Sequence, residues 1–86
     1  MTVQFSTRAW DDYLYWQQHD RKILKKINTL LEDIGRGDPH DGIGKPEPLK
    51  HALGGFWSRR ITDEHRLVYR VSEQTIQIAQ ARYHYQ

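Results

Sequence analysis

The chain has 86 residues, which is enough for one compact domain and too short for two. It has no cysteine, so disulfide and thiolate chemistry are excluded, and it lacks any run of roughly 18 apolar residues that could span a membrane. The net charge is only +2, but residues 1–44 are slightly acidic and residues 45–86 are basic. With no signal peptide at the N-terminus, these features predict a single domain over residues 1–86, located in the cytoplasm and able to meet a polyanion.

The first half of the chain predicts a short strand followed by two helices. "VQFS" (residues 3–6) favours a strand, and Ser6 or Thr7 is a suitable N-cap for a short helix with a stripe of Trp10, Tyr13, Leu14 and Gln17. A second helix begins near Asp20 and ends at Gly35 to Gly37. Its apolar residues recur at spacings of about four, three and four, at Ile23, Ile27, Leu30 and Ile34.

The second half predicts a loop followed by a sheet. Gly and Pro throughout residues 35–48 ("GRGDPHDGIGKPEP") exclude a regular element there. Three β-rich runs follow, "FWSRRIT" (56–62), "HRLVYRV" (65–71) and "TIQIAQARY" (75–83), with a turn near residues 72–74. The predicted fold class is therefore α+β, with N-terminal helices packed on an antiparallel β-sheet.

Alternation along the strands sorts side chains onto the two faces of this sheet. Leu67 and Tyr69 belong to the face that we expect the helices to cover, and Arg66 to the opposite face. On the last strand, Ile76, Ile78, Gln80, Arg82 and His84 form one set. A three-residue turn would bring Arg66 and His84 to the same face, whereas a two-residue turn would separate them, and the sequence leaves both open.

A carboxylate lies on one of the stiffest segments of the chain. Pro46 has a fixed φ, and Pro48 drives Glu47 toward an extended conformation, with Lys50 and His51 close behind. A carboxylate held in this way can be aimed at a substrate. An exposed loop glutamate between two turn-forming prolines is the simpler interpretation.

Four arginines on adjacent strands, Arg59, Arg60, Arg66 and Arg70, will share sheet faces, and arginine suits phosphate because its planar fork donates two hydrogen bonds. Pairing with Asp63, Glu64 or solvent is the commoner fate of a single arginine. A carboxylate, arginines and a histidine such as His84 together are sufficient for metal-free RNA cleavage by acid–base catalysis. Trp57, Tyr83 and Tyr85 are aromatic groups on which bases can stack.

The five histidines provide the competing hypothesis of a metal site. They occur at positions 19, 40, 51, 65 and 84, without the spacing of structural zinc ligands and without cysteine partners. Phosphate-binding and nucleophile-elbow motifs are also absent. We therefore expect no metal and no cofactor.

Six motifs in the same order resemble the Txe/YoeB family of toxins within the RelE superfamily. They are "WDDYLYWQ" (10–17), "KKIN" (25–28), "GKPEPLKH" (44–51), "GFWSRRIT" (55–62), "EHRLVY" (64–69) and "RYHY" (82–85). The resemblance implies a RelE-like, microbial-ribonuclease-like fold and an enzyme that cuts mRNA in the ribosomal A site, leaving 2′,3′-cyclic phosphate and 5′-OH ends. It also implies that Glu47 is the general base, His84 the general acid and Arg66 the transition-state cation. Lys50, Arg60 and Tyr85 would support them in substrate binding.

The same resemblance implies the partners of the protein. These are the ribosome with its mRNA and a YefM-like antitoxin, and operator DNA would be contacted only through that antitoxin. Exposed aromatics among Trp10, Tyr13 and Trp16 would be consistent with a homodimer. Two alternatives remain, a catalytically inactive antitoxin-binding module and a free-standing ribonuclease. Gln86, one residue beyond the family's terminal tyrosine, extends the tail.

Overall fold

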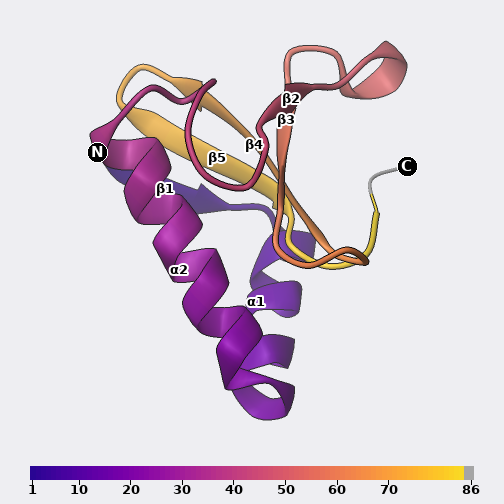
Figure 1. Ribbon diagram of the computed structural model, residues 1–86. Coiled ribbons are helices and arrows are strands. Elements are labelled where there is room, and N and C mark those ends of the chain that lie inside the picture. Colours follow the sequence, from indigo (N-terminus) through magenta and orange to yellow (C-terminus); the bar gives the residue numbers. More distant parts are fainter. Residues whose placement is uncertain (85–86) are drawn as a thin grey trace.

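Two helices cover one face of a five-stranded sheet in the computed structural model, which describes residues 1–84 (Figure 1). The elements in chain order are β1 (Thr2–Phe5), α1 (Thr7–His19), α2 (Arg21–Arg36), β2 (Glu47–Pro48), the 3₁₀ helix η1 (His51–Leu53), β3 (Trp57–Arg60), β4 (Arg66–Ser72) and β5 (Thr75–Gln80). Within the described part of the chain, neither helix is long and apolar enough to cross a membrane. The predicted α+β class, with helices first and sheet second, is confirmed.

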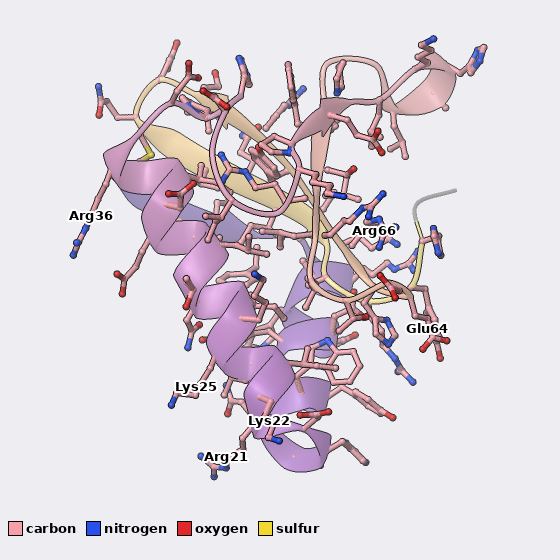
Figure 2. All side chains as sticks on the ribbon, in the orientation of Figure 1. Arg21, Lys22, Lys25, Arg36, Glu64 and Arg66 are labelled. Atoms are coloured by element: carbon pink, nitrogen blue, oxygen red, sulfur yellow. The ribbon has the colours of Figure 1, made fainter. Side chains whose placement is uncertain are left out.

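The second helix forms as its periodicity predicts. The Asp20 side chain caps it by accepting hydrogen bonds from the backbone N–H groups of Lys22 and Ile23, at 3.0 and 3.2 Å. Ile27, Leu30 and Ile34 are completely buried against the sheet. Cations project from the outer side of α2, as Figure 2 shows for Arg21, Lys22 and Lys25.

The first helix buries a different side from the one that its apolar stripe predicts. Trp10 and Leu14 are 46% and 37% exposed, whereas Ala9, Asp12 and Trp16 are buried. Asp12 belongs on the inner side because its carboxylate accepts a hydrogen bond from the backbone N–H of Ala81 at 2.9 Å. The exposure of Trp10 agrees with the expectation of exposed aromatics on this helix, whereas Trp16 is buried.

The sheet has the strand order β1-β5-β4-β3-β2 and is mixed. The antiparallel meander of β3, β4 and β5 is confirmed, while β1 adds a parallel edge strand beside β5. The prediction of a loop without regular structure is wrong at Glu47–Pro48, which pairs with Trp57–Ser58. A proline is tolerated there because β2 lies at the edge of the sheet, where its missing N–H leaves no inner strand unpaired.

The register between β4 and β5 answers the question that the sequence left open. Ser72 pairs with Thr75 across a two-residue turn, in which Glu73 and Gln74 have φ of 49° and 67°, as a type I′ turn requires. A β-bulge then shifts the pairing, so that Val68 lies opposite Gln80. The expectation that a two-residue turn separates Arg66 from the C-terminal histidine was therefore wrong, because an extra residue restores the face.

The bulge also corrects the predicted sets of side chains on the last strand. Ile76 and Ile78 are buried in the core, and after the bulge it is Ala81 that joins them. Gln80 instead lies in the row of Val68, on the face opposite the helices. The last residue of β5 is thus carried to the open face of the sheet.

Candidate functional site

The sheet register gathers the predicted catalytic groups on the face that the helices leave open. Glu47 is opposite Ser58, which is opposite Val68, and in the neighbouring row Arg60 is directly opposite Arg66. Side chains two positions apart on a strand are separated by about 7 Å on one face, and directly opposite ones by about 5 Å. One carboxylate and two guanidinium groups therefore share a small area of this face.

Glu47 is carried to the sheet by a well-defined edge strand. The strand is tied to β3, and directly after it the backbone N–H of Leu49 donates to the carbonyl oxygen of Phe56 at 2.9 Å. Leu49 is itself buried, which helps to hold the strand in place. The carboxylate is exposed at the start of a hollow that residues 47–53 line.

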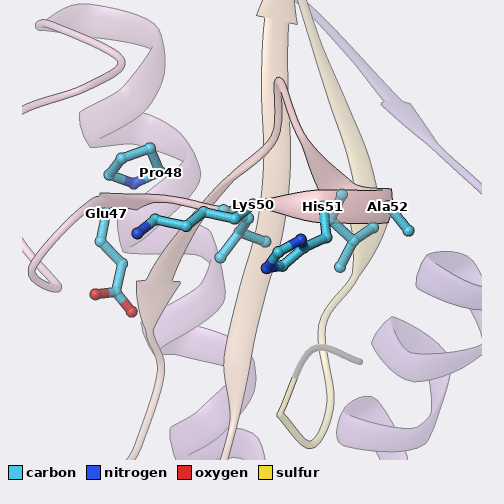
Figure 3. Close-up of a pocket in the computed structure, with 7 residues that line it drawn as sticks. Glu47, Pro48, Lys50, His51 and Ala52 are labelled. Carbon is cyan, nitrogen blue, oxygen red and sulfur yellow. The ribbon is translucent and has the colours of Figure 1, made fainter.

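Lys50 and His51 border the same hollow (Figure 3). Both are exposed, and in Figure 3 the side chain of Lys50 runs back toward Glu47. His51 has φ of 61°, so the chain turns sharply at the start of η1. This geometry brings a cation and an imidazole to the predicted general base.

A buried arginine fixes the loop that leads to Glu47. Arg59 has no exposed surface, its Nε donates to the hydroxyl of Tyr69 at 3.0 Å, and its Nη1 donates to the carboxylate of Asp33 at 2.5 Å. The same guanidinium donates to four backbone carbonyl oxygens of the loop, those of Asp38, Pro39, Asp41 and Ile43. The hydrogen bond from Arg59 holds the pKa of the Asp33 carboxyl below its usual range. Arg59 is therefore a structural residue that substrate cannot reach.

Gly44 completes the approach of this loop to the sheet. Its carbonyl oxygen accepts from the backbone N–H of Arg60 at 2.7 Å, and its φ is 80°. A Cβ at this position would lie 2.9 Å from a side-chain carbon of Leu30. The close contact needs glycine, and it fixes the point from which the chain runs to Glu47.

The C-terminal segment is held at its root by α1. The backbone N–H of Ala81 donates to the Asp12 carboxylate at 2.9 Å, and its carbonyl oxygen accepts from Nε1 of Trp16 at the same distance. Burial raises the pKa of the Asp12 carboxyl, and the hydrogen bond from Ala81 partly opposes this. Two side chains one helical turn apart thus bind both backbone polar groups of Ala81.

Beyond Ala81, the segment that carries His84 is held by the side chains of Gln80 and His65 and by the backbone of Arg66. Nε2 of Gln80 donates to the carbonyl oxygens of Arg82 and His84, at 2.9 and 2.6 Å. Tyr83 is held on both sides, since its N–H donates to Nδ1 of His65 at 2.8 Å and its carbonyl oxygen accepts from the N–H of Arg66 at 3.0 Å. His84 is exposed, and the peptide group that joins it to Tyr83 is the one that bonds to the backbone of Arg66. Tyr85 lies outside the described residues.

Arg66 is oriented through one of its three nitrogens. Nη1 donates to the carbonyl oxygens of Thr62, Asp63 and His65, at 2.6, 3.1 and 3.2 Å. Among residues 1–84, Nε and Nη2 of Arg66 make no hydrogen bond or ion pair. A guanidinium anchored on one side in this way presents two donors on the other, which suits a phosphate group.

The predicted base-stacking aromatics are separated by the sheet. Trp57 pairs with Tyr69 on the helix-covered side and stacks on His40, with ring centroids 4.2 Å apart. It therefore does not face the site. Tyr83 is 46% exposed, with Arg82 4.6 Å from its ring centroid, and remains a candidate.

Sequence reasoning missed the residues that hold the tail. Asp12, Trp16 and His65 act on backbone groups of residues 81–83 at separations that no local pattern encodes. Gln80 acts locally, on the carbonyl oxygens of Arg82 and His84. Over residues 1–84, no three side chains of the metal-ligating types converge on one point.

These observations define a class: a small α+β toxin of the RelE-like fold, with a carboxylate and two arginines on the open face and an anchored C-terminal segment beside them. A family model described as "YoeB-like toxin of bacterial type II toxin-antitoxin system" matches residues 5–85. The chain therefore belongs to the family of YoeB-like toxins of bacterial type II toxin-antitoxin systems.

Individual relatives agree with this assignment over the whole length. Toxin YoeB of Escherichia coli strain K12 is 60% identical over 85 residues, covering 99% of this chain and 100% of that protein. The YoeB–YefM complex from Staphylococcus aureus contains a chain with 52% identity and a TM-score of 0.93, covering 99% of this chain and 98% of that one. A YoeB dimer from the same species has 53% identity, a TM-score of 0.93 and the same coverage.

Proposed function

We propose that this toxin is an endoribonuclease that cuts mRNA in the ribosomal A site without a metal ion. The observation that carries the proposal is the gathering of Glu47, Arg60 and Arg66 on one sheet face, with the backbone of His84 anchored beside Arg66. These are the groups that cleavage by an internal 2′-hydroxyl needs. The other predicted binding residues are Lys50, on the same hollow as Glu47, and Tyr85, outside the described residues.

In the proposed reaction, Glu47 takes the proton from the 2′-hydroxyl as its oxygen attacks the adjacent phosphorus. The bond to the 5′-oxygen breaks, and His84 gives that oxygen a proton. The products are a 2′,3′-cyclic phosphate and a 5′-hydroxyl. Arg66 balances the negative charge that develops on the phosphoryl oxygens, and Lys50 and Arg60 bind the flanking phosphates.

The ribosome is proposed as the element that positions the substrate. The described site is an exposed sheet face with short loops, so it offers little surface for bending a flexible strand into line. Holding reacting groups in near-attack geometry contributes on the order of 7 to 11 kcal/mol, and a codon fixed in the A site would supply much of it. Basic groups on the open face support binding to ribosomal RNA.

Protein partners follow from the same family membership. We propose a YefM-like antitoxin, supported by the staphylococcal relative solved with YefM, and contact with operator DNA only through that antitoxin. A homodimer is supported by the staphylococcal YoeB dimer and by an exposed aromatic cluster. In that cluster, Trp10 lies 5.5 Å from Phe5 and 6.0 Å from Tyr13 between ring centroids.

The test is a single-turnover time course on mRNA in ribosome complexes with an empty A site and on the same mRNA alone. We expect fast cleavage only on the ribosome, and Glu47→Gln should slow it by about 10²- to 10⁴-fold without weakening ribosome binding. Equal cutting of free mRNA at the same positions would mean a free-standing ribonuclease. No cutting of either substrate would support an inactive antitoxin-binding module.

The metal-free chemistry has its own control. After the ribosome complexes are formed in magnesium, rapid addition of EDTA over the cleavage period should leave the rate unchanged. A rate that falls and is restored specifically by zinc or manganese, with ribosome integrity monitored, would contradict a mechanism that uses only side chains.

A further inference from the structure

We propose that His65 is a positioning residue for this reaction, holding the backbone of Tyr83 so that His84 stays beside Arg66. The inference rests on the proposed function of the site. It begins from a contact that joins a buried imidazole to a main-chain N–H 18 residues away, at 2.8 Å.

Tyr83 is the turning point of the tail. Its φ of 64° lies in the left-handed region, which a residue with a Cβ adopts only when surrounding contacts enforce it. The contacts here are the bond from its N–H to His65 Nδ1 and the bond from the Arg66 N–H to its carbonyl oxygen. Since Arg66 uses a backbone group, His65 provides the side-chain hydrogen bond to Tyr83 itself, while Gln80 holds the carbonyl oxygens on either side of it.

The hydrogen bond fixes the state of the ring. Because Nδ1 accepts a hydrogen bond from a backbone N–H, it must keep its lone pair. A neutral ring therefore carries its proton on Nε2. Nε2 lies 3.3 Å from a carboxylate oxygen of Glu64, a suitable acceptor. The ring is only 7% exposed and packs edge-on against Trp16, with centroids 4.8 Å apart. Its orientation is thus fixed on every side.

Charged side chains from three separate segments surround the ring. Asp20, Glu64 and Arg82 line the same hollow as His65. The Arg82 guanidinium lies 3.6 Å from the Tyr15 ring centroid and 4.6 Å from that of Tyr83, so it is part of the same packed group. A proton on Nδ1 would point at the Tyr83 N–H and remove the contact.

Loss of the hydrogen bond between His65 and Tyr83 would remove one of the contacts that position His84, the predicted general acid. His84 would still be held through its carbonyl oxygen by Gln80, at 2.6 Å, but the preceding residue would lose its side-chain anchor. A displacement of about 1 Å at a reacting group can cost about 10²-fold in rate. The effect should appear in the chemical step and not in the binding of the ribosome.

The test compares His65→Leu with His65→Asn, whose Oδ1 can accept at the place of Nδ1, and with His40→Leu as a matched control. His40 stacks on Trp57 and makes no contact with the tail. We expect His65→Leu to lower the single-turnover rate about 10²-fold at saturating ribosome complex, with unchanged ribosome affinity. His65→Asn should recover most of that rate, and His40→Leu should keep the wild-type rate.

Two measurements that need no activity keep this inference separate from the proposed function. Nitrogen NMR of the wild-type protein should find the His65 proton on Nε2, and amide exchange at Tyr83 should become faster in His65→Leu but stay slow in His65→Asn. If the wild type cuts no RNA, the proposed function fails while these measurements still decide whether His65 holds the tail. A folded His65→Leu variant with the wild-type rate, or with unchanged exchange at Tyr83, would overturn the inference.

Discussion

The two ends of the candidate site are held by different kinds of interaction. The loop leading to Glu47 is fixed by the fully buried Arg59, whose charge is matched by Asp33 and a set of carbonyl oxygens. The tail carrying His84 is fixed by single, partly buried hydrogen bonds to backbone groups. The contacts of Arg59 are built into the interior of the domain, whereas those of the tail attach one segment to a domain that is already packed.

This difference separates stability from activity. Removing one partner of a buried ion pair leaves an uncompensated charge in the interior, which destabilises the whole domain. Releasing a surface segment costs only the few bonds that held it. Loss of Arg59 or Asp33 should therefore destabilise the fold, whereas changes in the tail should stop the chemistry and leave the fold.

The largest effect is expected from deletion of residues 83–86. Cleavage on the ribosome should fall to background because the proposed acid is gone, while the core that Ala81 completes stays in place. The melting temperature should drop by no more than about 8 °C, which corresponds to about 1 kcal/mol in a domain of this size. Circular dichroism and a single-turnover assay measure the two quantities, and near-normal cutting would mean that His84 is not the acid.

Arg59→Leu tests the other end of the site, the loop that leads to Glu47, because it should destabilise the fold. The partly exposed Asp33 carboxylate and the loop carbonyl oxygens would lose their donor, and each buried acceptor left without a partner costs about 1 to 3 kcal/mol. Domains of this kind have a total stability of about 5 to 15 kcal/mol, so the loss is severe. Urea denaturation measures it, with the exposed neighbour Arg60→Leu as a control expected to change stability by less than about 0.5 kcal/mol.

Two variants, Arg66→Ala and Arg66→Lys, test what the guanidinium of Arg66 contributes to cleavage beside the tail. Both variants keep the backbone N–H that holds Tyr83, so they remove only the guanidinium. We expect Arg66→Ala to lower the cleavage rate about 10²- to 10³-fold, as loss of a transition-state donor does. Arg66→Lys should recover little, because an ammonium cannot present two fixed donors to a phosphoryl group. Full activity of the lysine variant would mean that charge alone matters there.

The sequence predicted the parts that depend on local pattern. The spacing of Ile27, Leu30 and Ile34 and the alternation of Leu67 and Tyr69 follow from periodicity, and their burial is confirmed. The β-bulge beside Val68 was not predictable, because an extra residue in a strand leaves no mark on composition. The bulge alone decides which face the tail reaches.

For the candidate site, the prolines around Glu47 were informative because they restrict the backbone itself. Residues that act on the backbone of a distant segment could not be recognised from the sequence. Asp12 contacts Ala81, and His65 contacts Tyr83, only after the fold has brought them together. The proposed chemical groups could thus be named from the sequence, but the side chains that hold them could not.

The smallest predicted effect is a pair of opposite pH dependences from the two anchoring carboxylates. The hydrogen bond from Arg59 lowers the pKa of Asp33 below its ordinary value of 3.8, so the unfolded chain binds its proton first as pH falls. The stability that Asp33 provides is present above about pH 4 and is lost as pH drops through its folded pKa. Burial raises the pKa of Asp12, so its contribution has the other sign and stability declines as pH rises through that folded value.

Urea denaturation between pH 3 and pH 7 separates the two contributions. Asp33→Asn should lower stability at pH 7 and make the fall in stability below pH 4 shallower, because the ion pair with Arg59 is gone. Asp12→Asn keeps an oxygen that can accept from Ala81, so it should leave stability at pH 7 unchanged or higher. It should also remove the gain in stability that protonation of Asp12 gives the folded chain, so stability should decline more steeply as pH falls from the raised folded pKa of Asp12 toward about pH 4. Equal slopes in both variants and the wild type would mean that neither carboxylate has a different pKa in the folded and unfolded chains, and the contrast between a charged anchor in the core and a backbone anchor at the tail would lose its electrostatic basis.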